Sequence, residues 1–190
     1  MQQISENLLV VNAGEPLPEG IEGALKIYLA GSCDIGPNQD FDWQGKFING
    51  LATLAKSDGG LIMLKNQRFV IMNPRYVPQN PTPGIVNPEF VTMMNWKQDM
   101  MAAADAVFCN FLKKSVSPMP MFEFGCLCGS GKMVVRCPEE YAGYGTVKIV
   151  CERNQIPLFP GKIGTVPVIV QALYSYIPAF KTAQQLILPE

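Results

Sequence analysis

The chain has 190 residues, of which 48% are hydrophobic and 16% charged, a composition typical of a globular protein with a buried core. Its formal net charge is −1 and it contains no block of Lys or Arg, which argues against a nucleic-acid-binding face. The chain contains no histidine, which excludes Ser-His-Asp catalysis, Cys-His catalysis and any imidazole base. Any chemistry must therefore use carboxylates, Tyr, Lys, Ser or Cys.

The six cysteines are scattered along the chain, as expected of reduced thiols in a cytoplasmic setting. Cys126 and Cys128 are one residue apart, with no second pair and no histidine, so we expect no zinc site. No apolar stretch approaches the ~20 residues of a membrane span. We expect no metal, no cofactor and no membrane association.

Taken in chain order, residues 1–24 form a turn-rich lead-in with one short apolar run, at 8–11, and residues 25–190 form a single domain. Apolar runs predict strands at 25–30, 61–64, 69–72, 106–112, 132–136 and 156–159. Helical spacing of apolar residues predicts helices at 42–57, 90–104, 121–128, 145–153 and 166–186, the last with a kink near Pro178. The proline-rich segment 76–88 is interpreted as a surface loop, either a lid over a pocket or a plain insertion.

Strands that alternate with helices predict a doubly wound α/β domain, with a mostly parallel sheet covered on both faces. Ligands bind such sheets at the carboxyl ends of the strands. The polar or glycine positions expected at those ends are Tyr28, Gly31, Ser32, Asn73, Ser117 and Glu123. Asp105 comes just before a strand, so the topology places it at the opposite end unless the preceding loop reaches over.

Glu123 lies in the pentapeptide Phe122–Cys126, which we expect to begin a helix. The positive end of the helix dipole would keep its carboxylate ionised. An ionised carboxylate that faces a crevice is what a glycosyl-transferring nucleophile requires. The alternative is a Glu that only stabilises the first turn of its helix. Trp43 and Trp96 likewise have two interpretations, as core anchors or as walls on which a base stacks.

The motifs at these positions resemble those of the nucleoside 2-deoxyribosyltransferase superfamily, particularly its divergent deoxyribosyltransferase-like branch. The matching pieces, in the family's order, are residues 27–32, Trp43, residues 73–75, Trp96, residues 104–105, residues 117–118 and residues 122–125. Together they span roughly residues 25 to 150.

The resemblance implies a flavodoxin-like, five-stranded domain that cleaves the N-glycosidic bond of 2′-deoxynucleosides. Glu123 would attack C1′ of the sugar and form a covalent deoxyribosyl-enzyme. Asp105 would help to protonate the leaving base, and Tyr28 would orient the nucleophile. The substrate-binding positions implied are Gly31, Ser32, Trp43, Asn73 and Ser117. The family also implies small-molecule partners, namely a deoxynucleoside or deoxynucleotide and a nucleobase, and a homo-oligomer of two or more chains.

Two positions depart from the family's pattern. Ser117 stands six residues before Glu123, where transferases often carry an acidic residue, and it is more similar to the related deoxynucleoside 5′-monophosphate N-glycosidases. Asp34, however, follows the first strand where that relative has a basic residue, and its charge would repel a phosphate. Three functions therefore stay open: deoxyribosyl transfer, hydrolysis with water as acceptor, and a non-catalytic nucleoside- or nucleotide-binding module.

Overall fold

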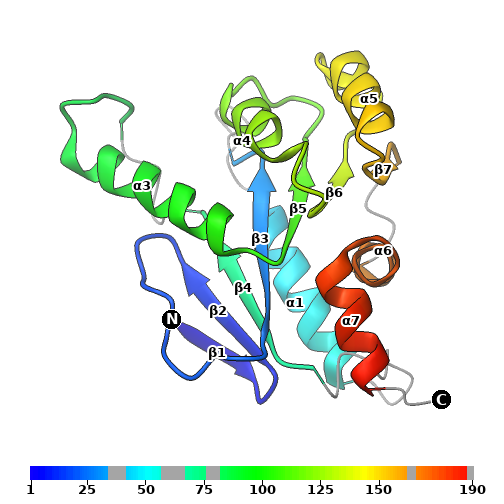
Figure 1. Ribbon diagram of the computed structural model, residues 1–190. Coiled ribbons are helices and arrows are strands. Elements are labelled where there is room, and N and C mark those ends of the chain that lie inside the picture. Colours follow the sequence, from blue (N-terminus) through cyan, green and yellow to red (C-terminus); the bar gives the residue numbers. More distant parts are fainter. Residues whose placement is uncertain (34–41, 57–66, 76–81, 162–165, 188–190) are drawn as a thin grey trace.

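The computed structural model describes residues 1–33, 42–56, 67–75, 82–161 and 166–187, and these form a mixed α/β fold around one central sheet (Figure 1). The strands are β1 (Gln2–Ser5), β2 (Leu8–Asn12), β3 (Leu25–Gly31), β4 (Phe69–Asn73), β5 (Ala106–Asn110), β6 (Met133–Arg136) and β7 (Leu158–Phe159). The helices are α1 (Trp43–Lys56), α3 (Pro88–Ala103), α4 (Met119–Leu127), α5 (Tyr144–Arg153), α6 (Val166–Tyr176) and α7 (Pro178–Ile187).

The sheet has seven strands in the order β1-β2-β4-β3-β5-β6-β7, and all neighbours are parallel except β1 and β2. The stretch β4-β3-β5-β6-β7 is the flavodoxin-like order for a domain whose first strand is β3. The predicted doubly wound α/β class is therefore confirmed, with seven strands instead of five. The two extra strands come from the N-terminal 24 residues: β2 pairs in parallel with β4, from Leu8 opposite Phe69 to Asn12 opposite Asn73.

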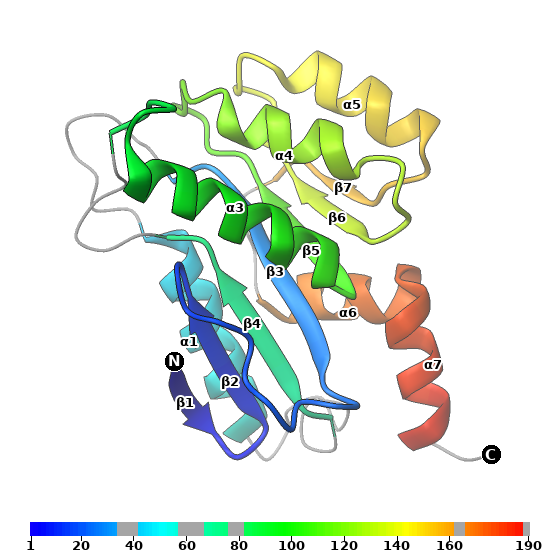
Figure 2. The same ribbon diagram turned by 60° about the vertical axis from the view of Figure 1, so that its left-hand side comes forward.

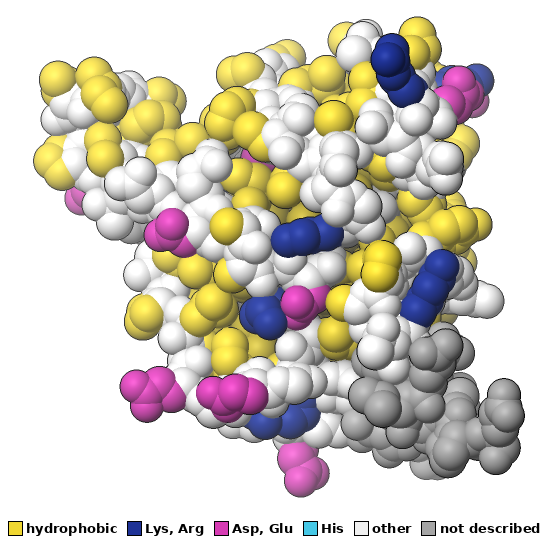
Figure 3. Space-filling view, viewed as in Figure 1, with side chains coloured by type: hydrophobic (Ala, Val, Ile, Leu, Met, Phe, Trp, Pro, Cys, Tyr) yellow, Lys and Arg dark blue, Asp and Glu magenta, His cyan; other side chains and the backbone are white. Residues whose placement is uncertain are grey.

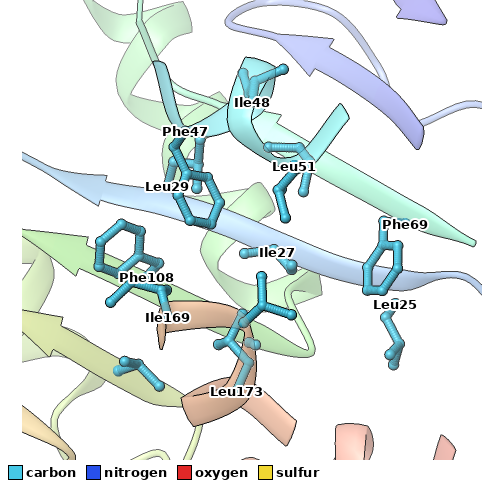
Figure 4. Packing of buried hydrophobic residues seen from close by; sticks show 14 of the residues in the cluster. Leu25, Ile27, Leu29, Phe47, Ile48, Leu51, Phe69, Phe108, Ile169 and Leu173 are labelled. Carbon is cyan, nitrogen blue, oxygen red and sulfur yellow. The ribbon is translucent and has the colours of Figure 1, made fainter. Parts of the chain in front are cut away.

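Helices cover both faces of the sheet, α1, α6 and α7 on one face and α3, α4 and α5 on the other (Figure 2). Alternate side chains of β3 supply the two cores, because successive side chains of a strand point to opposite faces. Leu25, Ile27 and Leu29 join the first core, where they meet helices α1 and α6 (Figure 4). Tyr28 and Ala30 join the second core, under α3 and α4.

Helix boundaries differ from the predicted ones at two places that matter. The predicted helix over 166–186 is two helices, α6 and α7, separated at Ile177, because Pro178 begins a new helix instead of kinking one. Helix α4 begins at Met119, two residues earlier than predicted. The predicted strand at 61–64 and residues 76–81 of the proline-rich loop lie outside the described residues.

Within the described part of the chain, no helix combines the length and the apolar character that crossing a membrane requires. On the face shown in Figure 3, Lys and Arg side chains are scattered, some of them beside acidic side chains, and form no continuous basic patch.

Candidate active site

The candidate site lies at the carboxyl end of β3, where the sheet has its topological switch point. The connection from β3 to β4 crosses one face of the sheet, and the connection from β4 to β5 crosses the other face. Crevices at such a switch point, outside the carboxyl ends of the strands, are where doubly wound sheets bind ligands. Helix α4, which follows β5, packs against β3 and brings Glu123 to this point.

The carboxylate of Glu123 is 1% exposed and is held by three donors. Its Oε1 accepts a hydrogen bond of 3.0 Å from the Tyr28 hydroxyl, and its Oε2 accepts one of 2.9 Å from the Gly31 backbone N–H. The ammonium of Lys97 lies 3.4 Å from Oε1. A buried carboxylate persists as an anion only where donors or a cation replace the water it has lost, and these three groups do so.

The helix dipole stabilises the Glu123 carboxylate less than we expected from the sequence. Because α4 begins at Met119, Glu123 lies beyond the first turn, where the effect of the dipole has faded. Ser117 helps to set this start, since its Oγ accepts a hydrogen bond of 3.2 Å from the Met119 N–H. The environment of Glu123 is therefore made mainly by side chains and backbone from β3 and α3.

Gly31 supplies its N–H from a conformation that favours glycine. Its φ is +122°, and a Cβ at this position would collide with the backbone of Asn110 on β5. Glycine thus allows the ends of β3 and β5 to approach closely. The same conformation leaves the Gly31 N–H directed at Glu123.

Tyr28 is fully buried under α4, and its hydroxyl stays protonated. Burial raises the pKa of this phenol well above its ordinary value of 10, and the negative charge of Glu123 raises it further. The hydroxyl therefore remains a hydrogen-bond donor to the carboxylate at any physiological pH.

Ser32 and Trp43 shape the exit from β3. The Ser32 hydroxyl accepts a hydrogen bond of 3.1 Å from the Leu112 N–H, and its carbonyl accepts one of 2.7 Å from the Trp43 indole. Trp43 is 2% exposed and packs edge-on against Phe108, with ring centroids 5.5 Å apart. Of its two interpretations, the structure supports the core anchor and leaves little ring surface for stacking on a base.

Asn73 and Ser117 lie on the carboxyl side of the sheet but do not contact Glu123. The Asn73 amide donates to the Asn12 side chain at 3.3 Å and accepts from the Arg75 N–H at 3.2 Å. Ser117 is engaged at the start of α4, as described above. Both residues are partly buried, so each keeps some accessible surface at this end of the strands.

Asp105 is not brought to Glu123, and the prediction that the two carboxylates share one site needs correction. Asp105 accepts a hydrogen bond of 2.8 Å from the Lys26 N–H, and its carboxylate lies 2.9 Å from the Lys26 ammonium. Both residues are at the amino-terminal ends of their strands, whereas Glu123 meets β3 at its carboxyl end. The preceding loop does not reach over, because α3 ends only two residues before Asp105.

Lys97 is the site residue that the sequence prediction missed. The spacing contained a signal: Met93, Trp96 and Met100 form the buried stripe of α3, and Lys97 follows Met93 by four residues. Residues four apart share a helix face, so Lys97 points inward as well. A lysine on the apolar face of a helix requires a buried partner, and that partner is Glu123.

Cys33 and Gln44 complete the surroundings just beyond β3. Gln44 is fully buried and its amide donates to the Cys33 sulfur at 3.0 Å. Burial raises the pKa of Cys33 to about 11, although the Lys97 charge opposes the shift. The thiol is therefore neutral at physiological pH.

The segment that contains the candidate site matches the model of one known protein family. A model of the family described as nucleoside 2-deoxyribosyltransferase-like matches residues 24–141, more than half of the chain. The matched segment runs from the start of β3 to beyond β6 and includes Tyr28, Gly31 and Lys97, which hold the Glu123 carboxylate. No curated protein matches the sequence significantly.

Proposed function

The chain belongs to the nucleoside 2-deoxyribosyltransferase-like family, and we propose that it transfers 2-deoxyribose between nucleobases through a covalent ester on Glu123. The observation that carries this proposal is the buried Glu123 carboxylate at the switch point of the sheet, held by Tyr28 and Gly31. The donors come from β3 and the nucleophile from α4, so the carboxylate is fixed before substrate arrives.

The proposed reaction has two steps. In the first, a Glu123 oxygen attacks C1′ of the deoxynucleoside, the C1′–N bond breaks, and the electron pair goes to the base nitrogen, which takes up a proton. In the second, a nitrogen of another base attacks C1′, the C1′–O bond breaks with its electron pair going to Glu123, and the acceptor loses its proton to solvent. One carboxylate can support such a double displacement, as in a retaining glycosidase.

The proton for the leaving base comes from water in this proposal. Asp105, the acid expected from the family resemblance, is bound to Lys26 at the amino-terminal ends of the strands, opposite the end at which Glu123 lies. Among the described residues, no second carboxylate makes a hydrogen bond or ion pair with the groups that hold Glu123. Asn73 and Ser117 remain the candidates for holding the sugar, since they lie beyond the carboxyl ends of the strands and keep some exposed surface, whereas Ser32 is fully buried.

The test is a chromatographic assay with each 2′-deoxynucleoside and its 5′-monophosphate, with and without a second free base. A new deoxynucleoside that forms only with the acceptor base supports transfer. Free base released without an acceptor indicates the hydrolase alternative, with the preferred substrate deciding the phosphate question. No product from any substrate would contradict the proposal and favour the binding module, whereas equal product from Glu123→Gln would contradict Glu123 as the nucleophile.

We also propose that the protein works as a homo-oligomer, as expected from the family resemblance of its sequence. Large apolar side chains are exposed where α3 and α4 begin: Ile85, Val86, Val116 and Phe122. Such side chains are normally covered when they cluster. Size-exclusion chromatography with light scattering tests this, and an Ile85→Glu, Val86→Glu double variant should dissociate the oligomer.

A further inference from the structure

Lys97 occupies an unusual place for a lysine. Its side chain is 5% exposed and extends from the Met-rich face of α3 to the Glu123 carboxylate. In the described part of the chain, Glu123 is its only hydrogen-bond or ion-pair partner. It is also the only cation within ion-pair distance of Glu123 among those residues.

Stability alone does not account for this pair. Burying two charges costs desolvation free energy that their attraction often fails to recover, so an apolar pair usually stabilises a core as well or better. Geometry does not require the lysine either, since Tyr28 and Gly31 already donate to both oxygens of Glu123. What Lys97 adds is a full positive charge.

Three neighbouring titratable groups carry no charge at pH 7. Tyr28, Cys33 and Cys109 interact electrostatically with Glu123. Burial raises the pKa of Tyr28 and of Cys109 well above the ordinary values and that of Cys33 to about 11, so all three are neutral at pH 7. Among the described groups that contact the Glu123 carboxylate, Lys97 is therefore the one that carries a positive charge. Arg75 also acts electrostatically on Cys33, but its ion pair is with Asp42, at 3.7 Å.

The proposed reaction changes the charge balance between Lys97 and Glu123. When a Glu123 oxygen bonds to C1′ and the base departs, the carboxylate becomes a neutral ester and the Lys97 ammonium is left buried without its counter-charge. When an acceptor attacks C1′, the C1′–O bond breaks, its electron pair returns to Glu123 and the ion pair is restored. A buried unpaired charge is costly, so the cation favours the second step over the persistence of the ester.

We infer that Lys97 is a positioning residue that holds Glu123 as a free anion and shortens the lifetime of the glycosyl ester. This inference rests on the proposed function for the ester itself. The charge relationship between Lys97 and Glu123 is independent of turnover, so it can be tested separately.

Two variants separate charge from shape. Lys97→Met removes the charge and matches the neighbouring Met93, Met100 and Met101, while Tyr28 and Gly31 still satisfy the carboxylate. Lys97→Arg keeps the charge. Circular dichroism and thermal melting establish that each variant is folded before any comparison is made.

The first measurement follows the ester by rapid acid quench and intact mass spectrometry after mixing with a deoxynucleoside. We expect Lys97→Met to accumulate the ester and to break it down ~10- to 100-fold more slowly than the unsubstituted protein, the range of a hydrogen bond to a charged group. Lys97→Arg should break it down nearly as fast as the unsubstituted protein. An equally short-lived ester in Lys97→Met, or an arginine variant that behaves like the methionine one, overturns the inference.

The second measurement needs no catalysis. A double-mutant cycle in urea unfolding compares the unsubstituted protein, Lys97→Met, Glu123→Gln and the double variant. Lys97→Met should destabilise the protein that carries Glu123 more than it destabilises Glu123→Gln, because only the former is left with a buried carboxylate without its counter-charge. Equal effects in the two backgrounds refute the role of Lys97, whereas absence of any product or ester in the unsubstituted protein refutes the proposed function alone.

Discussion

The hydroxyl of Tyr28 donates a hydrogen bond of 3.0 Å to Oε1 of Glu123, across 95 residues of sequence and with both side chains buried. This contact joins the first strand of the α/β core to the helix that follows β5. Together with the Gly31 N–H on Oε2, it fixes the position of the carboxylate at the switch point of the sheet.

Tyr28→Phe removes this donor and keeps the ring in the core. A hydrogen bond to a charged group contributes ~1.5–3 kcal/mol, so we expect the transfer rate to fall ~10- to 100-fold with the fold preserved. Steady-state kinetics and thermal melting measure the two effects. A rate unchanged from that of the unsubstituted protein would show that Tyr28 does not orient the nucleophile.

Gly31→Ala should destabilise the protein by ~3 kcal/mol or more, because the positive φ disfavours a side chain and the added Cβ meets the Asn110 backbone. Gly145→Ala is the matched control: Gly145 is exposed within α5 and a Cβ there meets nothing. That variant should be neutral or stabilised by up to ~1 kcal/mol. Urea unfolding compares the two, and equal midpoints would contradict the close approach of β3 and β5.

Asp105→Asn tests whether activity depends on a carboxylate at the amino-terminal ends of the strands, opposite the end at which Glu123 lies. The substitution weakens a partly exposed ion pair with Lys26, so we expect a loss of ~1 kcal/mol or less in unfolding free energy and less than a ~2-fold change in transfer rate. Urea unfolding and the product assay measure the two quantities. A fall in rate as large as that of Glu123→Gln would mean that Asp105 takes part in the chemistry after all.

Cys33 should react slowly with iodoacetamide despite its closeness to the site. With a pKa of about 11, only about one thiol in a thousand is ionised at pH 8, and that fraction rises ~30-fold by pH 9.5. Cys126 is exposed and should be alkylated first. Peptide mass spectrometry over time at both pH values gives the rates, and equal rates for the two cysteines at pH 8 would be the contrary result.

Much of the fold could be predicted from the sequence because the strands of the core are continuous apolar runs and helix α1 carries a clear apolar stripe. Strands β3 and β5 and helices α1 and α3 lie within about two residues of their predicted bounds. Strand β2 was not expected as part of the sheet, because its partner β4 is some 60 residues away in sequence and the apolar run is short. The division of the last predicted helix was missed because apolar periodicity continues across Pro178.

Part of the site could also be predicted, because some of its residues lie at the ends of predicted strands. Glu123, Tyr28 and Gly31 follow from strand ends and motif order, and the structure brings these three together. Lys97 was missed because a charged residue on an apolar helix face gives no indication of its partner until the tertiary packing is known. Asp105 lies where the topology places it, at the amino-terminal ends of the strands, and not in the site, where the family resemblance would place it.

The most direct test of the central claim is to trap the intermediate. The protein is mixed with a 2′-deoxynucleoside, quenched in acid within milliseconds to seconds, digested and mapped by tandem mass spectrometry. The account predicts one deoxyribosyl group on the peptide that contains Glu123, absent from Glu123→Gln and lost when a second base is added before the quench. Products that form without this adduct, or an adduct on another residue, would contradict Glu123 as the nucleophile.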